Sequence, residues 1–240
     1  MNLYLVRHGL STGNVAGRLQ GWSDTDLTPE GLRQAYKTAQ FFAYYRATHR
    51  LAFAAVYSSP LRRAWLTAAA IGERLGQAPL AVLDLREMHA GAIEGLTLAE
   101  WQSRYPEVAS AWRDRENLDF GWPGGETRRG FRARCLRAIS EIVAQHAPDD
   151  NLIVVTHGGF IKGYLAAAGL IDTAGSNPYS ADNCSITYVQ FTVDDADNGG
   201  GEVWGVGCLR VFNQVAHLQD GADDALGAAS LAANADLMLQ

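Results

Sequence analysis

The sequence predicts an α/β protein, a three-layer α/β/α sandwich whose central sheet is mostly parallel with an antiparallel edge strand. Short apolar runs alternate with helical segments along most of the chain, and this alternation is typical of parallel strands covered by helices on both faces. Towards the C-terminal end, residues 185–193 and 202–212 flank the turn-forming stretch 198–201 (NGGG), which predicts a hairpin at the edge of the sheet.

The first half of the chain begins with an expected strand at residues 3–6 (LYLV), a buried apolar run that ends in Arg7-His8-Gly9. Thr28-Pro29-Glu30 combines a capping hydroxyl, a proline at the first helical position and an acid, so we expect a helix from there to about residue 46. The next expected elements are a strand at 54–58, a helix from Ser59-Pro60 to about residue 75, and a weaker strand at 80–83.

The second half has no clear strand between residues 84 and 125, but Thr97-x-x-Glu100 is a capping box that predicts a helix start. The later expected elements are a helix at 126–146, a strand at 152–156 (LIVVT) and a helix at 160–168. No linker divides the chain, so we expect one domain over residues 1–215. Residues 216–240 are rich in Ala and Asp and predict a tail or a weak helix.

The composition narrows the classes of function. The chain has 240 residues and a formal net charge of −6, which disfavours nucleic acids and anionic membranes as partners. No apolar stretch is long enough to span a bilayer, and the N-terminus lacks the pattern of a signal peptide, so a cytoplasmic protein is expected. The three cysteines, Cys135, Cys184 and Cys208, lack the CxxC spacing of a zinc site. We therefore expect reduced thiols and neither a metal nor a cofactor.

Two of the expected strands end in histidine followed by glycine, at His8-Gly9 and at His157-Gly158. Ligands of open α/β sheets bind beyond the carboxyl ends of the strands. If these two strands are neighbours, both imidazoles meet at one edge, and the second strand leads into a helix whose amino end attracts anions. The sequence therefore predicts an anion site there.

Six ordered motifs give this site a more specific interpretation. They are RHGLSTGN at 7–14, QGW at 20–22 with DLTPEG at 26–31, SSPLRRAWLTA at 58–68, Glu87 before GxxEG at 91–95, PGGET at 123–127, and THGG at 156–159. With these motifs the chain resembles the histidine phosphatase superfamily, which includes the cofactor-dependent phosphoglycerate mutases, over roughly residues 2–190. The resemblance implies the phosphoglycerate mutase-like version of the fold.

The resemblance also implies roles for individual residues. His8 is the nucleophile that takes the phosphoryl group, Glu87 is the acid that protonates the leaving oxygen, and Arg7, Arg63 and His157 surround the transferred oxygens. Substrate binding is assigned to Asn14, Gln20, Gly21 and Gly158.

These residue types suit phosphoryl transfer on physical grounds. The reaction needs an in-line nucleophile and a positive cradle for the phosphoryl oxygens, and arginine grips two oxygens without losing its charge. The two arginines favour an ionised Glu87, whereas a bound phosphate dianion favours its protonated form. We therefore expect Glu87 to act as an acid mainly when substrate is bound. Asp84 and Glu94 are the alternatives to Glu87, and Arg62 is expected to be a solvated neighbour of Arg63.

The motifs leave three functions open. In phosphoglycerate mutases the acid is typically followed by Arg, one residue and Tyr, whereas Met88-His89-Ala90 follows Glu87 here. We therefore predict a metal-independent phosphatase that acts on a small phosphate monoester. Phosphoglycerate mutase-type transfer and a non-catalytic phosphate-binding module are the alternatives. Leu10 replaces the family's usual Glu or Gln, so the identity of the substrate is not predicted. A homodimer is compatible with the sequence.

Overall fold

The computed structural model describes residues 1–114, 116–172, 179–194, 203–204 and 207–219. Its main sheet has six strands in the order β3-β2-β4-β1-β5-β8. The bounds are β1 Asn2–Arg7, β2 Ala55–Ser58, β3 Leu80–Ala81, β4 Asn151–Thr156, β5 Ile186–Gln190 and β8 Cys208–Gln214. β1 to β4 pair in parallel, β5 pairs antiparallel with β1, and β8 pairs antiparallel with β5 at the edge of the sheet. The predicted sheet with its antiparallel edge is confirmed.

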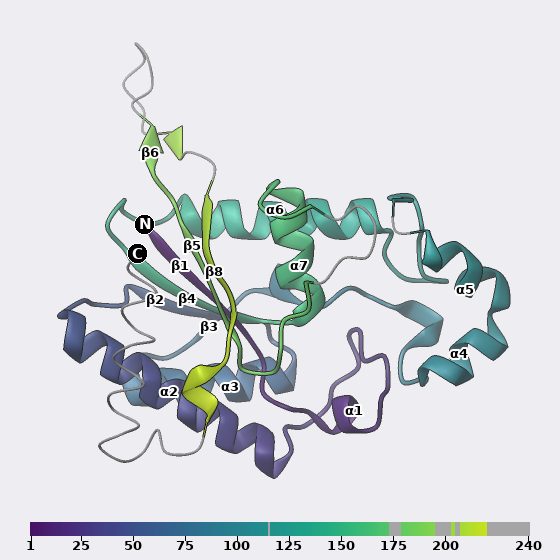
Figure 1. The fold of residues 1–240 in the computed structure, drawn as a ribbon, viewed down its shortest axis with the longest axis horizontal. Helices are drawn as coiled ribbons and strands as arrows, with labels where there is room; N and C mark the ends of the chain where they lie inside the picture. Colours follow the sequence, from purple (N-terminus) through teal and green to yellow (C-terminus); the bar gives the residue numbers. More distant parts are fainter. Residues whose placement is uncertain (115, 173–178, 195–202, 205–206, 220–240) are drawn as a thin grey trace.

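Helices cover both faces of this sheet (Figure 1). The α-helices of the described residues are α1 Thr12–Val15, α2 Pro29–His49, α3 Arg62–Leu75, α4 Leu98–Arg104, α5 Pro106–Arg113, α6 Arg128–Val143 and α7 Gly158–Ala167. Side chains of α2 and α3 share one core with Tyr4 and Ile153, and those of α6 and α7 share another with Leu5 and Val154. The two cores explain why β1 and β4 are apolar on both faces.

Hydroxyl caps set where several helices begin. The Thr28 hydroxyl accepts from the Gly31 N–H at the start of α2, and the Thr97 and Glu100 pair forms the predicted capping box at α4. The Thr127 hydroxyl caps α6, which therefore begins two residues after the expected Glu126. α3 begins at Arg62 rather than at Ser59-Pro60, because Leu61 is its N-cap.

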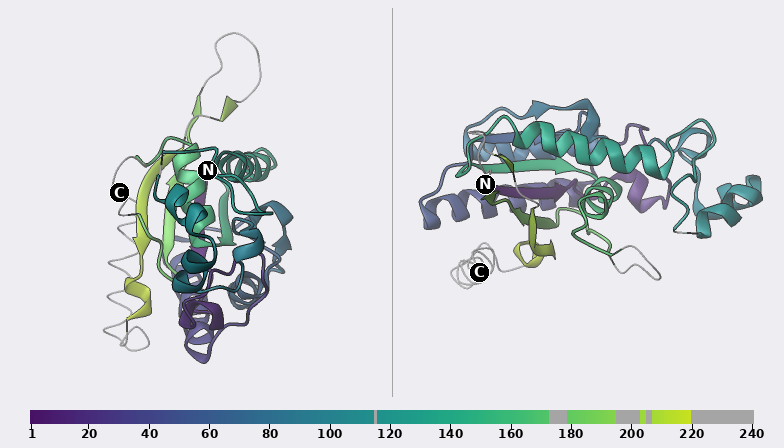
Figure 2. Two further views of the ribbon diagram at one scale, coloured as in Figure 1. Left: turned by 90° about the vertical axis from the view of Figure 1, so that its right-hand side faces the viewer. Right: turned by 90° about the horizontal axis from the view of Figure 1, so that it is seen from above.

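Some elements differ from the expectations. α1 and α5 were not predicted, and β3 keeps only two residues of the expected strand because the chain turns into a 3₁₀ helix at Leu83–Leu85. α4 and α5 lie beyond the end of the sheet towards which β1 runs (Figures 1 and 2). Trp101 and Trp122 are buried in one apolar cluster with Ile93 and Ala109, so these two tryptophans pack α4 and α5 against the neighbouring loops.

The hairpin and the C-terminal segment are described in part. β5 pairs with β8, and β6 Val193–Asp194 pairs with β7 Val203–Trp204, while the predicted turn at 198–201 lies outside the described residues. Ala216–Leu218 forms a 3₁₀ helix in which His217 is buried, and the Lys37 ammonium donates to the carbonyls of Leu218 and Gln219. The rest of the predicted tail, 220–240, also lies outside the described part.

Helices in the described part of the chain are too short or too polar to cross a bilayer.

Candidate active site

The carboxyl ends of three adjacent strands bring the predicted histidines together. Arg7 in β1 is level with Thr156 in β4, so His8 and His157 emerge side by side, and their ring centroids are 5.2 Å apart. Ser59 follows the next strand, β2, and its hydroxyl oxygen lies 2.8 Å from His157 Nε2. The predicted meeting of the two imidazoles is confirmed.

His8 has the protonation state of a nucleophile. Its Nδ1 lies 2.7 Å from the Gly9 carbonyl oxygen, which can only accept, so Nδ1 carries the hydrogen and Nε2 carries the lone pair. The ring is 3% exposed. Burial first, and then the charges of Arg63 and Arg7, hold the pKa of His8 well below its usual value. The imidazole is therefore neutral and can attack through Nε2.

His157 is fully buried, and burial together with the charge of Arg63 also holds its pKa well below the usual value. The Ser59 hydroxyl oxygen accepts from the Leu61 N–H, so its single hydrogen is available for His157 Nε2. In that arrangement His157 Nδ1 carries the ring hydrogen. This nitrogen is buried and has no hydrogen-bond partner among the described residues, so it can donate to an anion.

Arg63 is 1% exposed and points inward from α3. Its two terminal nitrogens each donate over 2.8 Å, Nη1 to the Ser23 carbonyl and Nη2 to the Gly21 carbonyl. The guanidinium thus holds the loop that follows α1 against the site. Burial lowers the pKa of Arg63. The guanidinium nevertheless keeps its charge, because the pKa of arginine lies far above neutral pH.

Arg7 closes the cradle from β1. Its Nη1 donates to the Ala181 carbonyl over 2.6 Å. The Nε atoms of Arg7 and Arg63 are buried and, like His157 Nδ1, have no partner in the part of the chain that the structure describes. A buried donor without an acceptor costs free energy. The charges of Arg63 and Arg7 lower the pKa values of both His8 and His157, so the two guanidinium groups lie close to both imidazoles.

Glu87 lies opposite these donors, at the amino end of α7. Its Oε2 accepts from the Gly159 N–H over 2.9 Å, and its Oε1 accepts from the Met88 N–H over 2.8 Å. Among all charged groups, Glu87 has the largest effect on the pKa values of both Arg7 and Arg63, which it raises against the effect of burial. Glu87 therefore lies close to both arginines, and its role as the proton donor remains a prediction.

The two alternative acids have structural partners. Glu94 accepts from the N–H groups of Trp22 and Ala90 and from the Ser23 hydroxyl. The Asp84 carboxylate forms an ion pair with Arg137 on α6, with 2.7 Å between Oδ2 and Nη2. Hydrogen bonds to Trp22, Ser23 and Ala90 thus occupy Glu94, and an ion pair occupies Asp84.

The predicted substrate-binding residues lie around this cradle. Asn14 Oδ1 accepts from the Ser11 N–H and from the Asn183 amide, and Gln20 Oε1 accepts from the Ser11 hydroxyl. Gly21 has φ of +50°, and a Cβ there would lie 2.2 Å from Glu94 Oε1, so only glycine fits. Gly158 opens α7, and a Cβ on it would lie 3.3 Å from Arg7 Nε. These contacts explain the residue types, and the roles in substrate binding remain predictions.

Comparison with known proteins agrees with this geometry. The model of the histidine phosphatase superfamily (branch 1) matches residues 3–197. The chain belongs to the histidine phosphatase superfamily. This confirms the family predicted from the six motifs.

Two relatives with similar sequences are named as phosphatases. A glucosyl-3-phosphoglycerate phosphatase from Mycolicibacterium vanbaalenii is 36% identical over 173 residues, which cover 69% of this chain and 72% of that protein. A metal-independent phosphoserine phosphatase from Arabidopsis thaliana is 36% identical over 175 residues, which cover 72% of this chain and 71% of that protein. These relatives confirm the predicted enzyme class, a phosphatase of this superfamily.

A solved structure also resembles this histidine phosphatase over most of its length. It is that of a mycobacterial glucosyl-3-phosphoglycerate phosphatase in complex with VO3, with a TM-score of 0.72 and 31% identity. The match covers 89% of this chain and 99% of that chain.

Several contacts of the histidine phosphatase site were not predicted. The Thr67 hydroxyl accepts from the Gly9 N–H over 3.0 Å, and the Asn183 amide donates to the His8 carbonyl over 2.9 Å. Ser59 could have been found by the argument used for the histidines, because it too follows a buried strand at the same edge. Asn183 could not, since nothing in the sequence indicates that the loop before β5 reaches His8.

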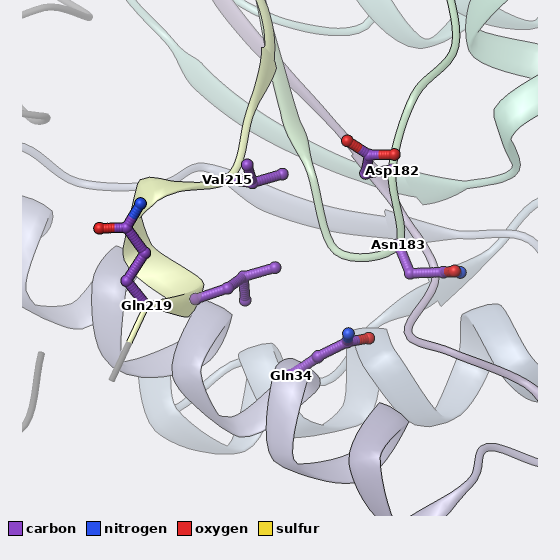
Figure 3. A pocket seen from close by; sticks show the side chains of 6 residues that line it. Gln34, Asp182, Asn183, Val215 and Gln219 are labelled. Carbon is purple, nitrogen blue, oxygen red and sulfur yellow. The ribbon is translucent and has the colours of Figure 1, made fainter. Parts of the chain in front are cut away.

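An open cavity of about 430 Å³ lies next to this Asn183 loop. Figure 3 shows Gln34 reaching it from α2, Asp182 and Asn183 from the loop, and Val215 and Gln219 from the end of the chain that is described. Its lining does not include Arg7, Arg63 or His157, and we assign it no role.

Within the described ranges, no three His, Cys, Asp or Glu side chains are grouped so as to hold a metal ion. Metal independence stays a prediction.

Proposed function

We propose that this histidine phosphatase hydrolyses a small phosphate monoester through a phosphohistidine on His8, with Glu87 as the general acid. The observation that carries the proposal is the neutral, buried His8 beside three buried nitrogens that lack acceptors, on Arg7, Arg63 and His157. A phosphoryl group supplies oxygens for these donors and a phosphorus atom for Nε2.

In the first step, the lone pair of His8 Nε2 attacks phosphorus, and the bond between phosphorus and the ester oxygen breaks. The electron pair of that bond goes to the leaving oxygen, which takes the proton of Glu87 and departs as an alcohol. Arg7 and Arg63 stabilise the negative charge on the phosphoryl oxygens throughout the transfer.

In the second step, water attacks the phosphohistidine. The Glu87 carboxylate takes a proton from the water, the bond between nitrogen and phosphorus breaks, and the electron pair returns to Nε2. Inorganic phosphate leaves, and both His8 and Glu87 are again in their starting states. His8 therefore takes the phosphoryl group in the first step and releases it in the second, while Glu87 first donates a proton and then accepts one.

The two relatives that are compared in sequence support hydrolysis. The two that are compared in sequence are named for the removal of phosphate from small organic phosphates, and one is named metal-independent. Each is about one third identical to this chain over most of its length. Which monoester this chain prefers is best found by a screen of phosphorylated metabolites with the purified enzyme.

The proposal is tested with p-nitrophenyl phosphate in the presence of a chelator. We expect turnover that survives chelation, an acid-labile phosphoprotein in a rapid quench, and loss of both in His8→Ala. The exposed Arg62→Ala serves as the control that keeps both. Label trapped on His8→Ala would place the nucleophile elsewhere. Interconversion of 2- and 3-phosphoglycerate without hydrolysis would indicate a mutase, and phosphate binding without any turnover would indicate a binding module.

A further inference from the structure

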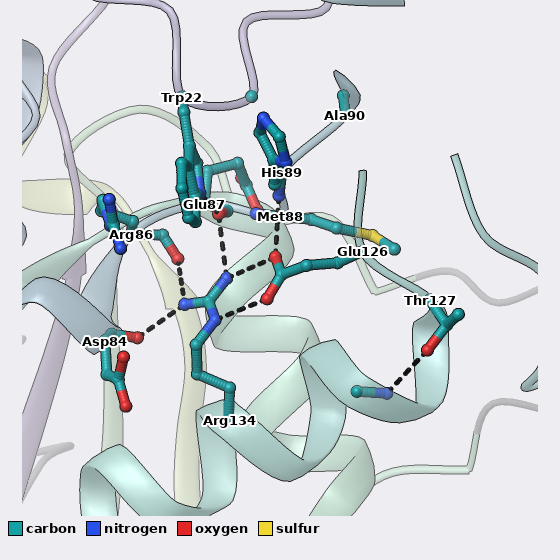
Figure 4. A network of polar contacts seen from close by, with 12 residues as sticks. Trp22, Asp84, Arg86, Glu87, Met88, His89, Ala90, Glu126, Thr127 and Arg134 are labelled. Atoms are coloured by element: carbon teal, nitrogen blue, oxygen red, sulfur yellow. Dashed lines mark hydrogen bonds and ion pairs between the residues drawn. The ribbon is translucent and has the colours of Figure 1, made fainter. Parts of the chain in front are cut away.

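A buried arginine from another element holds the loop that carries Glu87 through hydrogen bonds. Arg134 lies in α6, and its side chain is 8% exposed. Its Nη1 donates to the carbonyls of Asp84 (2.7 Å) and Arg86 (2.8 Å), and its Nη2 donates to the carbonyl of Glu87 itself (3.1 Å). Figure 4 shows the guanidinium between these carbonyls. One side chain thus fixes the backbone on the N-terminal side of the acid.

Glu126 completes the grip. Its two carboxylate oxygens accept from Arg134 Nε and Nη2, each over 2.7 Å. Oε2 also accepts from the His89 N–H over 2.8 Å, and the Glu126 N–H donates to the His89 carbonyl over 2.9 Å (Figure 4). The ion pair therefore holds the loop on both sides of Glu87.

The hydrogen bonds of Arg134 decide what kind of role it can have. A guanidinium has five N–H donors, and here five acceptors take them, three loop carbonyls and the two oxygens of Glu126. No donor is left for a phosphate oxygen, unlike Arg7 and Arg63, whose Nε atoms lack partners among the described residues. Arg134 therefore belongs to the support of the site and not to the cradle.

The position of the Glu87 carboxylate depends on this loop. The carboxylate is held by the N–H groups of Met88, which is in the loop, and Gly159, which is in α7. If the backbone of the loop shifts, these two bonds cannot both keep their length. Misplacement of an acid by about 1 Å is enough to slow proton transfer strongly.

We propose that Arg134, together with Glu126, is a positioning residue that holds Glu87 in place to protonate the leaving oxygen. This role rests on the function proposed above. It predicts a specific defect: hydrolysis of alkyl phosphates, whose leaving oxygen needs a proton, falls more than hydrolysis of aryl phosphates, whose leaving oxygen does not.

The test compares kcat/KM for an alkyl phosphate and for p-nitrophenyl phosphate in Arg134→Lys. Lysine keeps the charge but has three donors for five acceptors. We expect roughly a tenfold or larger loss with the alkyl phosphate and about threefold or less with the aryl phosphate, since a general acid contributes 10² to 10⁴ in rate. Arg129→Lys is the matched control, because Arg129 is an exposed arginine of the same helix that pairs with Asp119. This variant should leave kcat/KM unchanged for both substrates.

Glu87→Gln separates the positioning role from the acid role. If Glu87→Gln slows both substrates equally, the general-acid function itself fails. If Glu87→Gln slows the alkyl phosphate selectively while a folded Arg134→Lys slows both equally, only the positioning role is overturned. In the Glu87→Gln background, Arg134→Lys should no longer change the ratio of the two substrates.

Glu126→Gln gives a second measurement of the same ratio in case Arg134→Lys does not fold, as judged by circular dichroism. Loss of the fold in both variants at the assay temperature would assign the pair to stability and overturn the positioning role.

Discussion

Arg62 and Arg63 are adjacent on α3 and lie in opposite environments. Arg63 is 1% exposed and donates to the Gly21 and Ser23 carbonyls, whereas Arg62 is exposed and pairs with Asp26. We expect Arg63→Lys to lower kcat/KM for p-nitrophenyl phosphate by roughly a hundredfold, because the single ammonium nitrogen of lysine cannot span the two carbonyls and a phosphoryl oxygen as the planar guanidinium can. Arg62→Lys, as the matched control, should stay within about twofold. Equal losses of kcat/KM in the two variants would show that Arg63 does not stabilise the phosphoryl group.

The residues of the cradle could be predicted because each stands in a local pattern. His8 and His157 each follow a buried strand and precede a glycine, and Arg63 stands in a motif at the start of a helix. Arg134 has no such pattern. It donates to the carbonyls of residues about fifty positions earlier. Every residue has a backbone carbonyl, so the residue types in the loop do not reveal this contact. Only the folded arrangement of α6 against the loop reveals it.

At the scale of elements, the amino end of α7 brings His157 and Glu87 close together. The Gly159 N–H donates to Glu87 Oε2, and a Cβ on Gly159 would lie 2.3 Å from Glu87 Oε1. We expect Gly159→Ala to push the carboxylate away and to slow alkyl phosphates by roughly tenfold or more, with a smaller loss for p-nitrophenyl phosphate. The ratio of kcat/KM for the two substrates measures this.

Gly130→Ala on α6 is the control for that change, because a Cβ there would meet only the Thr127 hydroxyl, at 3.2 Å. An unchanged substrate ratio in Gly159→Ala would show that Glu87 tolerates the added methyl group and is not held by this helix end.

Elements were predictable where one physical pattern dominates them. β1 and β4 are continuous apolar runs, and α2 begins with a capping threonine and a proline. α1 has only the four residues TGNV, too few to show a helical period, and α5 begins directly after α4 with Tyr105 shared between them. Short elements that depend on tertiary contacts therefore escape prediction from sequence patterns.

On the scale of the whole molecule, the fold buries three histidines in neutral form, His8 and His157 at the carboxyl ends of β1 and β4 and His217 in the 3₁₀ helix after β8. Burial is the largest cause that lowers the pKa of His8 and His157 well below 6.5, and it lowers that of His217 to about 3. These imidazoles stay neutral in the folded protein at pH values where the unfolded chain protonates them. The unfolded state thus binds more protons, and the free energy of unfolding falls as the pH drops below 6.5.

The resulting loss of stability can be measured by urea unfolding at pH 7.5 and 5.5. Each histidine should lower the free energy of unfolding by about 1.4 kcal/mol over this interval, since the unfolded pKa near 6.5 lies in the middle of it. His217→Gln should keep the loss due to His8 and His157 and should remove about 1.4 kcal/mol of the total. Between pH 7.5 and 8.5, where imidazoles are neutral in both states, the two proteins should show the same small pH dependence. If His217→Gln retains the full loss between pH 7.5 and 5.5, the burial of a neutral His217 against Thr38 is not what makes the fold sensitive to acid.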